Sequence, residues 1–309
     1  MGKYIVKRLL LMIPILFGVS LLIFFILSFV PGNPGQIALG QDAPPEVIYE
    51  YNEKLGFYDP FPTKYVKYIS GAVRGDLGNS WRTGRPVADE IAMKLPVTVK
   101  LSVLSVITAA VLGISLGILS AIKQYSALDV ICTSGAIAFA SMPRFWLGMI
   151  LVIIFSVNLK WLPSNGIGDW RFYVLPTLTL ALPTAAQIMR LTRSTMLETI
   201  KQDYIRTAKA KGAPSSSVIW KHALKNALMP VVTVIGMDFG YLMGGTVLVE
   251  TVFSMSGIGT LMITSIRNQD VPQIQGTILF LAVCICVTML LVDIVYAFID
   301  PRVRLRYSK

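Results

Sequence analysis

Long uninterrupted stretches of apolar residues constrain this chain more than any other feature of its sequence. A helix needs about 20 apolar residues to cross the hydrocarbon core of a bilayer, and the first such stretch covers residues 9–30. Only 15% of all residues are charged, whereas soluble domains carry about a quarter. The sequence therefore predicts an all-α integral membrane protein. The five further predicted spans are residues 101–122, 136–157, 173–189, 228–249 and 277–299.

The first apolar stretch has an alternative interpretation as a secretory signal peptide. Lys3, Lys7 and Arg8 precede it, as basic residues do in such peptides. However, its 22 residues exceed the roughly 7–15 apolar residues of a cleaved signal. It also ends in Val30-Pro31-Gly32 instead of a site with small residues at alternate positions. We therefore expect residues 1–30 to hold a cytoplasmic end and a retained first helix.

Lysine and arginine residues in the short loops predict the orientation of the spans. If the N-terminus is cytoplasmic, the inner segments carry 16 of these residues and the short outer loops carry three. Cytoplasmic loops of membrane proteins are enriched in this way, so both termini are expected inside. The net charge of +11 is then explained without nucleic acid. The inner residues include four near the C-terminus: Arg302, Arg304, Arg306 and Lys309.

The extracytoplasmic segment, residues 31–96, is too regular in pattern to be a linker. Two stretches within it, Glu46–Leu55 and Phe61–Val73, are predicted to form short helices, and turn signals such as Asp59-Pro60 separate them. The segment is either a small cap packed on the bundle or a docking surface for a protein that delivers substrate. The residues alone do not decide between these two interpretations.

The inner segment, residues 190–227, carries the most informative pattern. A hydrophilic helix is predicted over 191–211, and Gly212 follows at the position where a left-handed residue commonly ends a helix. Ser215–Ser217 can cap a second short helix over about 218–227. Pro230 then falls in the first turn of the fifth span, where proline is tolerated. The prediction is a helix, a tight turn and a second helix on the cytoplasmic face.

Charge and apolar residues alternate along this inner segment. Eight lysines and arginines lie there against Glu198 and Asp203. The positive-inside rule alone needs only one or two cations. We therefore favour a surface that binds a partner protein, while a purely topological role for the charges is the alternative. The apolar residues expected to contribute to that surface are Ile205, Ala208, Ile219, Trp220 and Leu224.

The same segment resembles the cytoplasmic signature of permease subunits of binding-protein-dependent ABC importers, in the peptide/nickel branch. The sequence Asp203-Tyr204-Ile205-Arg206-Thr207-Ala208-Lys209-Ala210-Lys211-Gly212 precedes His222-Ala223-Leu224-Lys225-Asn226-Ala227-Leu228-Met229-Pro230. Weaker matches, in the same order along the chain as in the family, lie at residues 31–34, 75–78, 143–148, 252–259 and 300–302. The chain departs from the family pattern at Arg206, where the signature opens with Glu, at Asn33 for Asp, and at Ser256 for Pro.

The resemblance implies a six-helix type I ABC-importer-like bundle with a core permease domain over residues 97–309. It also implies a homologous second permease subunit, two cytoplasmic ABC ATPase subunits and an extracytoplasmic solute-binding protein, in the cytoplasmic membrane of a bacterium or archaeon. The implied cargo is a dipeptide or oligopeptide, with glutathione or a nickel complex as alternatives. The residues carried over as ATPase-coupling are Asp203, Arg206, Ala208, Gly212, His222, Leu224 and Asn226.

The residues themselves predict no catalytic site, metal site or cofactor in this chain. A phosphate-binding loop needs Gly-Lys followed by Ser or Thr, but the one Gly-Lys pair, Gly2-Lys3, precedes Tyr4. ATP and Mg²⁺ are therefore expected on the partner ATPases. The chain has one histidine, which excludes a multi-histidine metal site. Its three cysteines lie in apolar runs and are expected to be small core residues: Cys132, Cys284 and Cys286.

Three ionisable residues fall at membrane depth, where charge is costly and commonly functional. Asp238 lies about ten residues into the fifth span between Gly236 and Gly240, and we predict that it faces the transport pathway. Arg144 in the third span either pairs with Asp238 or extends its side chain to the inner membrane interface. Asp293 near the inner end of the sixth span is expected to bond a neighbouring helix in preference to a ligand.

Two other function classes compete with the importer interpretation. An intramembrane aspartyl protease could use Asp238 and Asp293, but its Gly-x-Gly-Asp pattern is missing because Ile235 occupies the first glycine position. A proton-coupled carrier would use buried acids but would leave the basic inner segment without a role. Separately, Gly113 and Gly117 have the spacing of a close helix-packing face.

Overall fold

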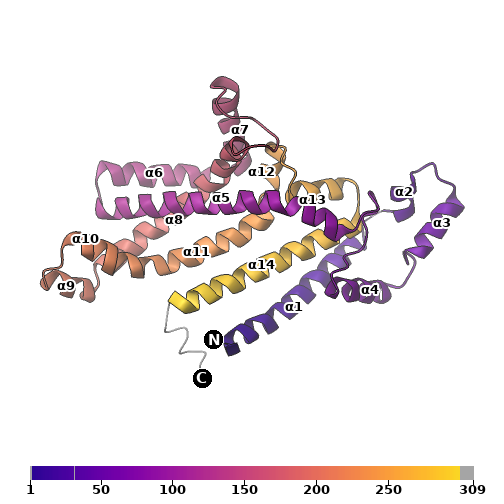
Figure 1. Cartoon of the computed structure of the whole chain (residues 1–309), viewed down its shortest axis with the longest axis horizontal. Helices are drawn as coiled ribbons and strands as arrows, with labels where there is room; N and C mark the ends of the chain where they lie inside the picture. Colours follow the sequence, from indigo (N-terminus) through magenta and orange to yellow (C-terminus); the bar gives the residue numbers. More distant parts are fainter. Residues whose placement is uncertain (1, 31, 300–309) are drawn as a thin grey trace.

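A computed structural model describes residues 2–30 and 32–299 of the chain. This part is helical and contains no β-strand. Figure 1 shows the five longest helices side by side along the long axis of the molecule. The cationic residues and the family match beyond residue 299 lie outside the described residues. The five helices are α1 (Gly2–Leu27), α5 (Val87–Ile122), α8 (Arg171–Ile200), α11 (Leu224–Gly245) and α14 (Val271–Ile299).

The third predicted span, residues 136–157, is not one continuous helix. It is divided between α6 (Ala127–Ser141) and α7 (Arg144–Leu151), and α7 continues as a π-helical segment, η1 (Val152–Asn158). The axes before and after the break differ by 108°, and α7 leaves the bundle in Figure 1. Pro143 explains the break, since a proline disfavours helical geometry in the residue before it. Met142 is accordingly extended, with φ −80° and ψ 129°.

Five of the described helices are long and apolar enough to cross a membrane, and the bent pair makes six if it counts as one span. The packing of α5 on α8 depends on two glycines of α5. A Cβ atom on Gly113 would lie 2.7 Å from Cβ of Ile188, and one on Gly117 would lie 2.6 Å from Cβ of Thr192. Because these two glycines lack side chains, α5 and α8 can approach closely. This contact confirms the predicted packing face.

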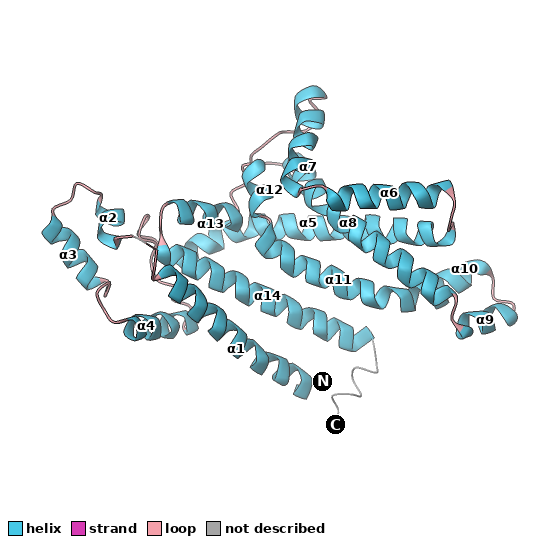
Figure 2. Ribbon diagram, turned by 180° about the vertical axis from the view of Figure 1, so that it is seen from behind, coloured by secondary structure: helices cyan, strands magenta, loops and turns pink. Residues whose placement is uncertain are grey.

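The predicted extracytoplasmic segment forms three short helices at the end of the molecule where α1 ends and α14 begins (Figure 2). They are α2 (Pro34–Leu39), α3 (Pro45–Lys54) and α4 (Phe61–Val73), so both predicted helices of this segment are confirmed. On α4, Tyr65 packs its ring 5.3 Å from that of Phe24 of α1, and its hydroxyl lies 2.9 Å from Oγ of Ser20. The segment thus packs on the first helix through α4, and we call it the cap.

The inner segment differs from its prediction in two ways. The predicted helix over 191–211 is interrupted, because α8 ends at Ile200 and α9 begins at Asp203 (Asp203–Ala210). The second predicted helix is not separate: α10 (Ser215–Ser217) and the π-helical η2 (Val218–Ala223) continue directly into α11. Pro230 consequently lies inside a helix and not in its first turn. Gly212 does adopt the predicted left-handed conformation, with φ +81°.

A second helical hairpin follows α11. It consists of α12 (Val247–Val252) and α13 (Ile258–Arg267), and α14 begins four residues after α13. In Figure 1 it lies toward the end of the bundle that carries α2–α4, far from α9 and α10.

Candidate coupling surface and membrane-depth residues

The inner hairpin, defined here as residues 201–223, is fixed to the bundle by an apolar cluster. Ile205 of α9 is completely buried and packs with Met196 of α8 and with Val218 and Ala223 of η2. The prediction that Ile205 contributes to a partner-binding surface is wrong. Its role is to hold α9 against the ends of the spans, since a buried isoleucine stabilises such a contact by about 1.5–3 kcal/mol.

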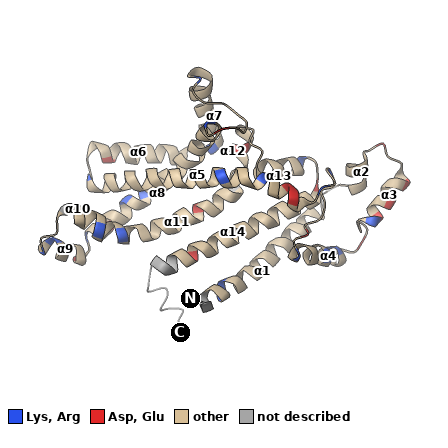
Figure 3. Cartoon of the chain, viewed as in Figure 1, with Lys and Arg blue, Asp and Glu red and all other residues tan. Residues whose placement is uncertain are grey.

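The rest of the hairpin presents charged and aromatic side chains to solvent. Figure 3 shows lysine and arginine gathered where α9 and α10 form one end of the molecule. Trp220 remains 59% exposed, and Tyr204 is also exposed. Of the seven coupling residues taken from the resemblance, three are half-buried, namely Ala208, His222 and Leu224. The exposed four are Asp203, Arg206, Gly212 and Asn226.

A hydrogen bond joins α9 of the hairpin to the first turn of α11. The Asn226 amide donates from Nδ2 to the Tyr204 hydroxyl at 2.9 Å, and also to the backbone carbonyl of His222 at 3.3 Å. Asp203 and Arg206 form only a loose ion pair of 3.8 Å in which both side chains are almost fully exposed. Such pairs contribute little to stability, so both charges are available to a partner.

A buried ion pair near this end was not found from the sequence. Arg193 of α8 donates from Nε and Nη2 to the two carboxylate oxygens of Asp129 on α6, both at 2.7 Å. The carboxylate also accepts hydrogen bonds from the Ser120 hydroxyl of α5, from the Tyr125 backbone N–H at 2.9 Å and from the Thr133 hydroxyl at 3.4 Å. Three helices are joined by this one cluster. The only sequence signal was an acid opening an apolar stretch, and 64 residues separate it from its arginine.

Arg144 lies close to an aromatic ring of α11 but does not form an ion pair with Asp238. The Arg144 guanidinium lies 5.2 Å from the ring centre of Tyr241, one turn after Asp238 on α11. Arg144 stands at the first position of α7, directly after the bend. Oδ2 of Asp238 is buried and has no hydrogen-bond partner in the described part of the chain. A carboxylate oxygen without a partner is costly at this depth and suits a mobile ligand.

Asp293 has a structural partner. Its Oδ1 accepts a hydrogen bond of 3.0 Å from Nη2 of Arg8, which joins α14 to α1. This contact agrees with the expectation that Asp293 bonds a neighbouring helix. We therefore set Asp293 apart from the other two membrane-depth candidates.

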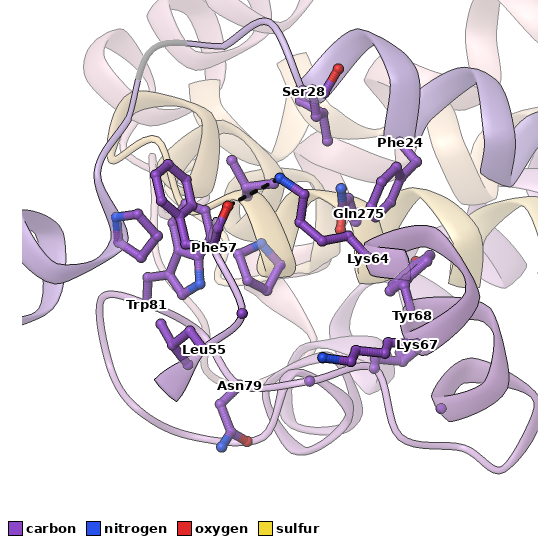
Figure 4. A pocket seen from close by; sticks show the side chains of 18 of the residues that line it. Phe24, Ser28, Leu55, Phe57, Lys64, Lys67, Tyr68, Asn79, Trp81 and Gln275 are labelled. Atoms are coloured by element: carbon purple, nitrogen blue, oxygen red, sulfur yellow. Dashed lines mark hydrogen bonds between the residues drawn. The ribbon is translucent and has the colours of Figure 1, made fainter. Parts of the chain in front are cut away.

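A cavity of about 460 Å³ lies at the other end of the molecule, between the cap, the C-terminal end of α1 and the N-terminal end of α14 (Figure 4). Lys64 reaches into it and donates a hydrogen bond to the Phe57 carbonyl at 3.2 Å. Burial, with a smaller contribution from Tyr65, raises the pKa of the Tyr68 phenol to about 12. Among the described residues no group of three or more His, Cys, Asp or Glu side chains is placed to hold a metal ion.

Comparison with known proteins identifies the family. Residues 113–305 match the family described as binding-protein-dependent transport system inner membrane component, and residues 1–102 match its N-terminal family. The glutathione transport system permease protein GsiC of Escherichia coli (strain K12) is 41% identical over 304 residues, which cover 98% of this chain and 99% of GsiC. GsiC of Shigella boydii serotype 4 is 40% identical with the same coverage.

Two solved structures share the fold. One is the MetNI methionine ABC transporter in inward-facing conformations, with a TM-score of 0.57, 18% identity, and coverage of 68% of this chain and 96% of that chain. The other is an amino acid ABC transporter, with a TM-score of 0.52, 14% identity, and coverage of 69% and 94%. The fold is thus that of a type I importer. The chain belongs to the inner membrane components of binding-protein-dependent transport systems, and it is the multi-pass permease subunit of an ABC importer.

Proposed function

We propose that this permease carries di- or oligopeptides inward and that its inner hairpin binds the ATPase subunits that drive transport. The observation that most supports ATPase binding is the structure of the inner hairpin. A cluster around Ile205 fixes its shape, while its cations and Trp220 remain open to solvent. A rigid, exposed and amphipathic surface of this kind is suited to transmit motion from a partner.

The proposed assembly contains a second, homologous permease subunit, two cytoplasmic ATPases and an extracytoplasmic binding protein. Both termini face the cytoplasm in this arrangement, since the hairpin and the N-terminal cations then lie on the inner side. The ATPases hold ATP and Mg²⁺, and this chain neither binds nor hydrolyses nucleotide. Purified chain alone is expected to show no ATP hydrolysis, and a measurable rate that survives removal of the ATPases would contradict the proposal.

Glutathione is the second candidate cargo, because the relatives of 40–41% identity are named for its transport. Peptides and glutathione share an ammonium and carboxylates, so one pathway chemistry serves both. A nickel complex is a weaker alternative. Bare nickel prefers histidine or cysteine ligands, and the described residues do not gather them.

We further propose that Asp238 lines the pathway and attracts the ammonium group of the cargo. Its buried, unpartnered oxygen supports this assignment, as does the neighbouring Arg144, which can attract a carboxylate. The pair would favour zwitterionic cargo over anions or cations, because each charge of the cargo then meets its opposite.

The test is ATP-driven uptake by the complete complex in vesicles. Asp238→Asn keeps the shape of the side chain and removes its charge, so dipeptide and glutathione uptake should both fall about tenfold or more while assembly is unchanged. Asp293→Asn is the matched control, since that acid is already paired with Arg8. Normal uptake of every cargo by Asp238→Asn would exclude Asp238 from the pathway. In the complex without substitutions, uptake of dipeptides but not of glutathione, or the reverse, would decide which of the two is the cargo.

A further inference from the structure

Glu250 is a completely buried carboxylate at the outer end of the bundle. It lies on α12, and the described residues provide no cation within ion-pair distance of it. Burying an unpaired carboxylate is costly, and an apolar residue of similar size would commonly give a more stable fold. The presence of a carboxylate here therefore requires an explanation beyond packing.

Three neutral donors from three segments satisfy this carboxylate. Oε1 accepts hydrogen bonds from the hydroxyl groups of Thr98 on α5, at 2.7 Å, and of Thr246, which precedes α12, at 2.9 Å. Oε2 accepts from the backbone N–H of Thr260 in the first turn of α13, at 3.0 Å. The Thr98 hydroxyl in turn accepts the backbone N–H of Ile258 at 2.9 Å. One side chain thus joins α12 and α13 to α5.

The space around the carboxylate is closed by glycines. A Cβ atom on Gly257 would lie 2.5 Å from the Glu250 carboxyl group, and one on Gly259 would lie 2.6 Å from Cα of Val247. The start of α13 can therefore approach the carboxylate only because these two residues lack side chains. The positive end of the α13 dipole faces the negative charge and favours it further.

The hairpin of α12 and α13 also contacts α7 and the extracytoplasmic segment. At the end of α12, the Phe253 ring packs against Gly148 of α7, so closely that a Cβ there would lie 3.2 Å from the ring. Beyond α13, the buried Asp270 accepts the backbone N–H of Trp81 at 3.0 Å, which links the hairpin to the extracytoplasmic segment. A shift of α13 relative to α5 would therefore be transmitted to both α7 and the cap.

We propose that Glu250 is a positioning residue that holds α13 against α5 while the outer end is closed, and that transport requires these contacts to break. Cargo from outside must pass this end, so the hairpin has to move in each cycle. Contacts from neutral hydroxyl and N–H donors suit a reversible latch, because water can replace each donor when the site opens. The proposal rests on the importer function of the family and is independent of Asp238 and of the cargo.

The test compares Glu250→Gln with Thr98→Ser in the complete complex. Glutamine keeps the size of the side chain and removes its charge. Its amide oxygen can accept from the Thr260 N–H and its NH₂ group can donate to the threonine hydroxyls, so the contacts that remain are neutral and weaker. The serine variant keeps the hydroxyl that both donates and accepts and serves as the control. Spin labels at Met93 on α5 and Thr264 on α13, both exposed, report the separation of the two helices in a background without native cysteines.

We expect Glu250→Gln to raise the open-to-closed population ratio about tenfold, because hydrogen bonds to a charged group are replaced by neutral ones. ATP hydrolysis without binding protein should rise, and uptake per ATP should fall. Thr98→Ser should match the parent chain in all three measurements. If the glutamine variant fails to assemble, Thr98→Val removes the same link from the α5 side. Unchanged distance distributions and unchanged uptake per ATP in the assembled variant would overturn the proposal.

Discussion

The ion pair between Asp129 and Arg193 provides the sharpest test of how the inner end is held together. The Asp129 side chain is 5% exposed and that of Arg193 is 25% exposed. Removing one partner of a buried pair costs about 3–5 kcal/mol, since the remaining charge is left without compensation. Arg193→Met leaves the carboxylate with three neutral donors, the hydroxyls of Ser120 and Thr133 and the Tyr125 N–H, so we expect the lower end, about 3 kcal/mol.

The reverse substitution should cost less. Asp129→Asn leaves an arginine that is partly exposed and can reach water, so we expect a loss of about 1–2 kcal/mol. In the double variant no buried charge is left unpaired. Its cost should therefore fall below the sum of the two single costs by more than about 1 kcal/mol, a non-additivity typical of residues in contact.

The assay is reversible unfolding in mixed micelles with increasing sodium dodecyl sulfate, followed by far-ultraviolet circular dichroism. All four chains are compared under the same lipid and detergent conditions. A loss below about 1 kcal/mol for Arg193→Met, or single costs that add within about 0.5 kcal/mol, would refute the reasoning. Either result would mean that the pair does not tie α5, α6 and α8 together.

Three further predictions use the same assay. Gly117→Ala should destabilise the fold by about 1–3 kcal/mol through a clash with Thr192, whereas Gly18→Ala, with open space around it, should not; equal effects would contradict the close approach of α5 and α8. Asp293→Asn should cost less than about 1 kcal/mol, because the pair with Arg8 is partly exposed; a larger cost would show a stronger role. The raised pKa of Tyr68 favours its neutral form in the fold. The contribution of Tyr68 to the free energy of unfolding should therefore be fully present below about pH 10 and be lost as the pH rises toward 12. Tyr68→Phe should reduce that loss.

Local patterns were sufficient where neighbouring residues determine the structure. Gly212 took the left-handed conformation that its place after α9 requires, and Phe61–Val73 formed the helix that the turn signal before it bounds. Gly113 and Gly117 lie on a close-packing face, since four-residue spacing puts them on the same side of α5. In each case the determining interactions lie within one or two helical turns.

Other features depend on contacts between distant segments and were missed. Asp129 and Arg193 are ordinary residues until α6 and α8 pack together. Glu250 gives no sign in the sequence that the Thr98 hydroxyl, 152 residues away, donates a hydrogen bond to it. The bend at Pro143 was overlooked because the apolar run continues through it. The charges around Ile205 predict a surface position, because its packing against α8 depends on a residue from another helix.

The proposal that the inner hairpin receives the ATPases is tested most directly by site-directed crosslinking in native membranes. Lys209→Cys places a thiol on the exposed face of α9, and Val73→Cys places one on the exposed cap at the opposite end. In a chain without native cysteines, a short bifunctional maleimide should join position 209 to an ATPase subunit and leave position 73 unjoined to it. No ATPase crosslink at 209, or one at 73, would contradict the account.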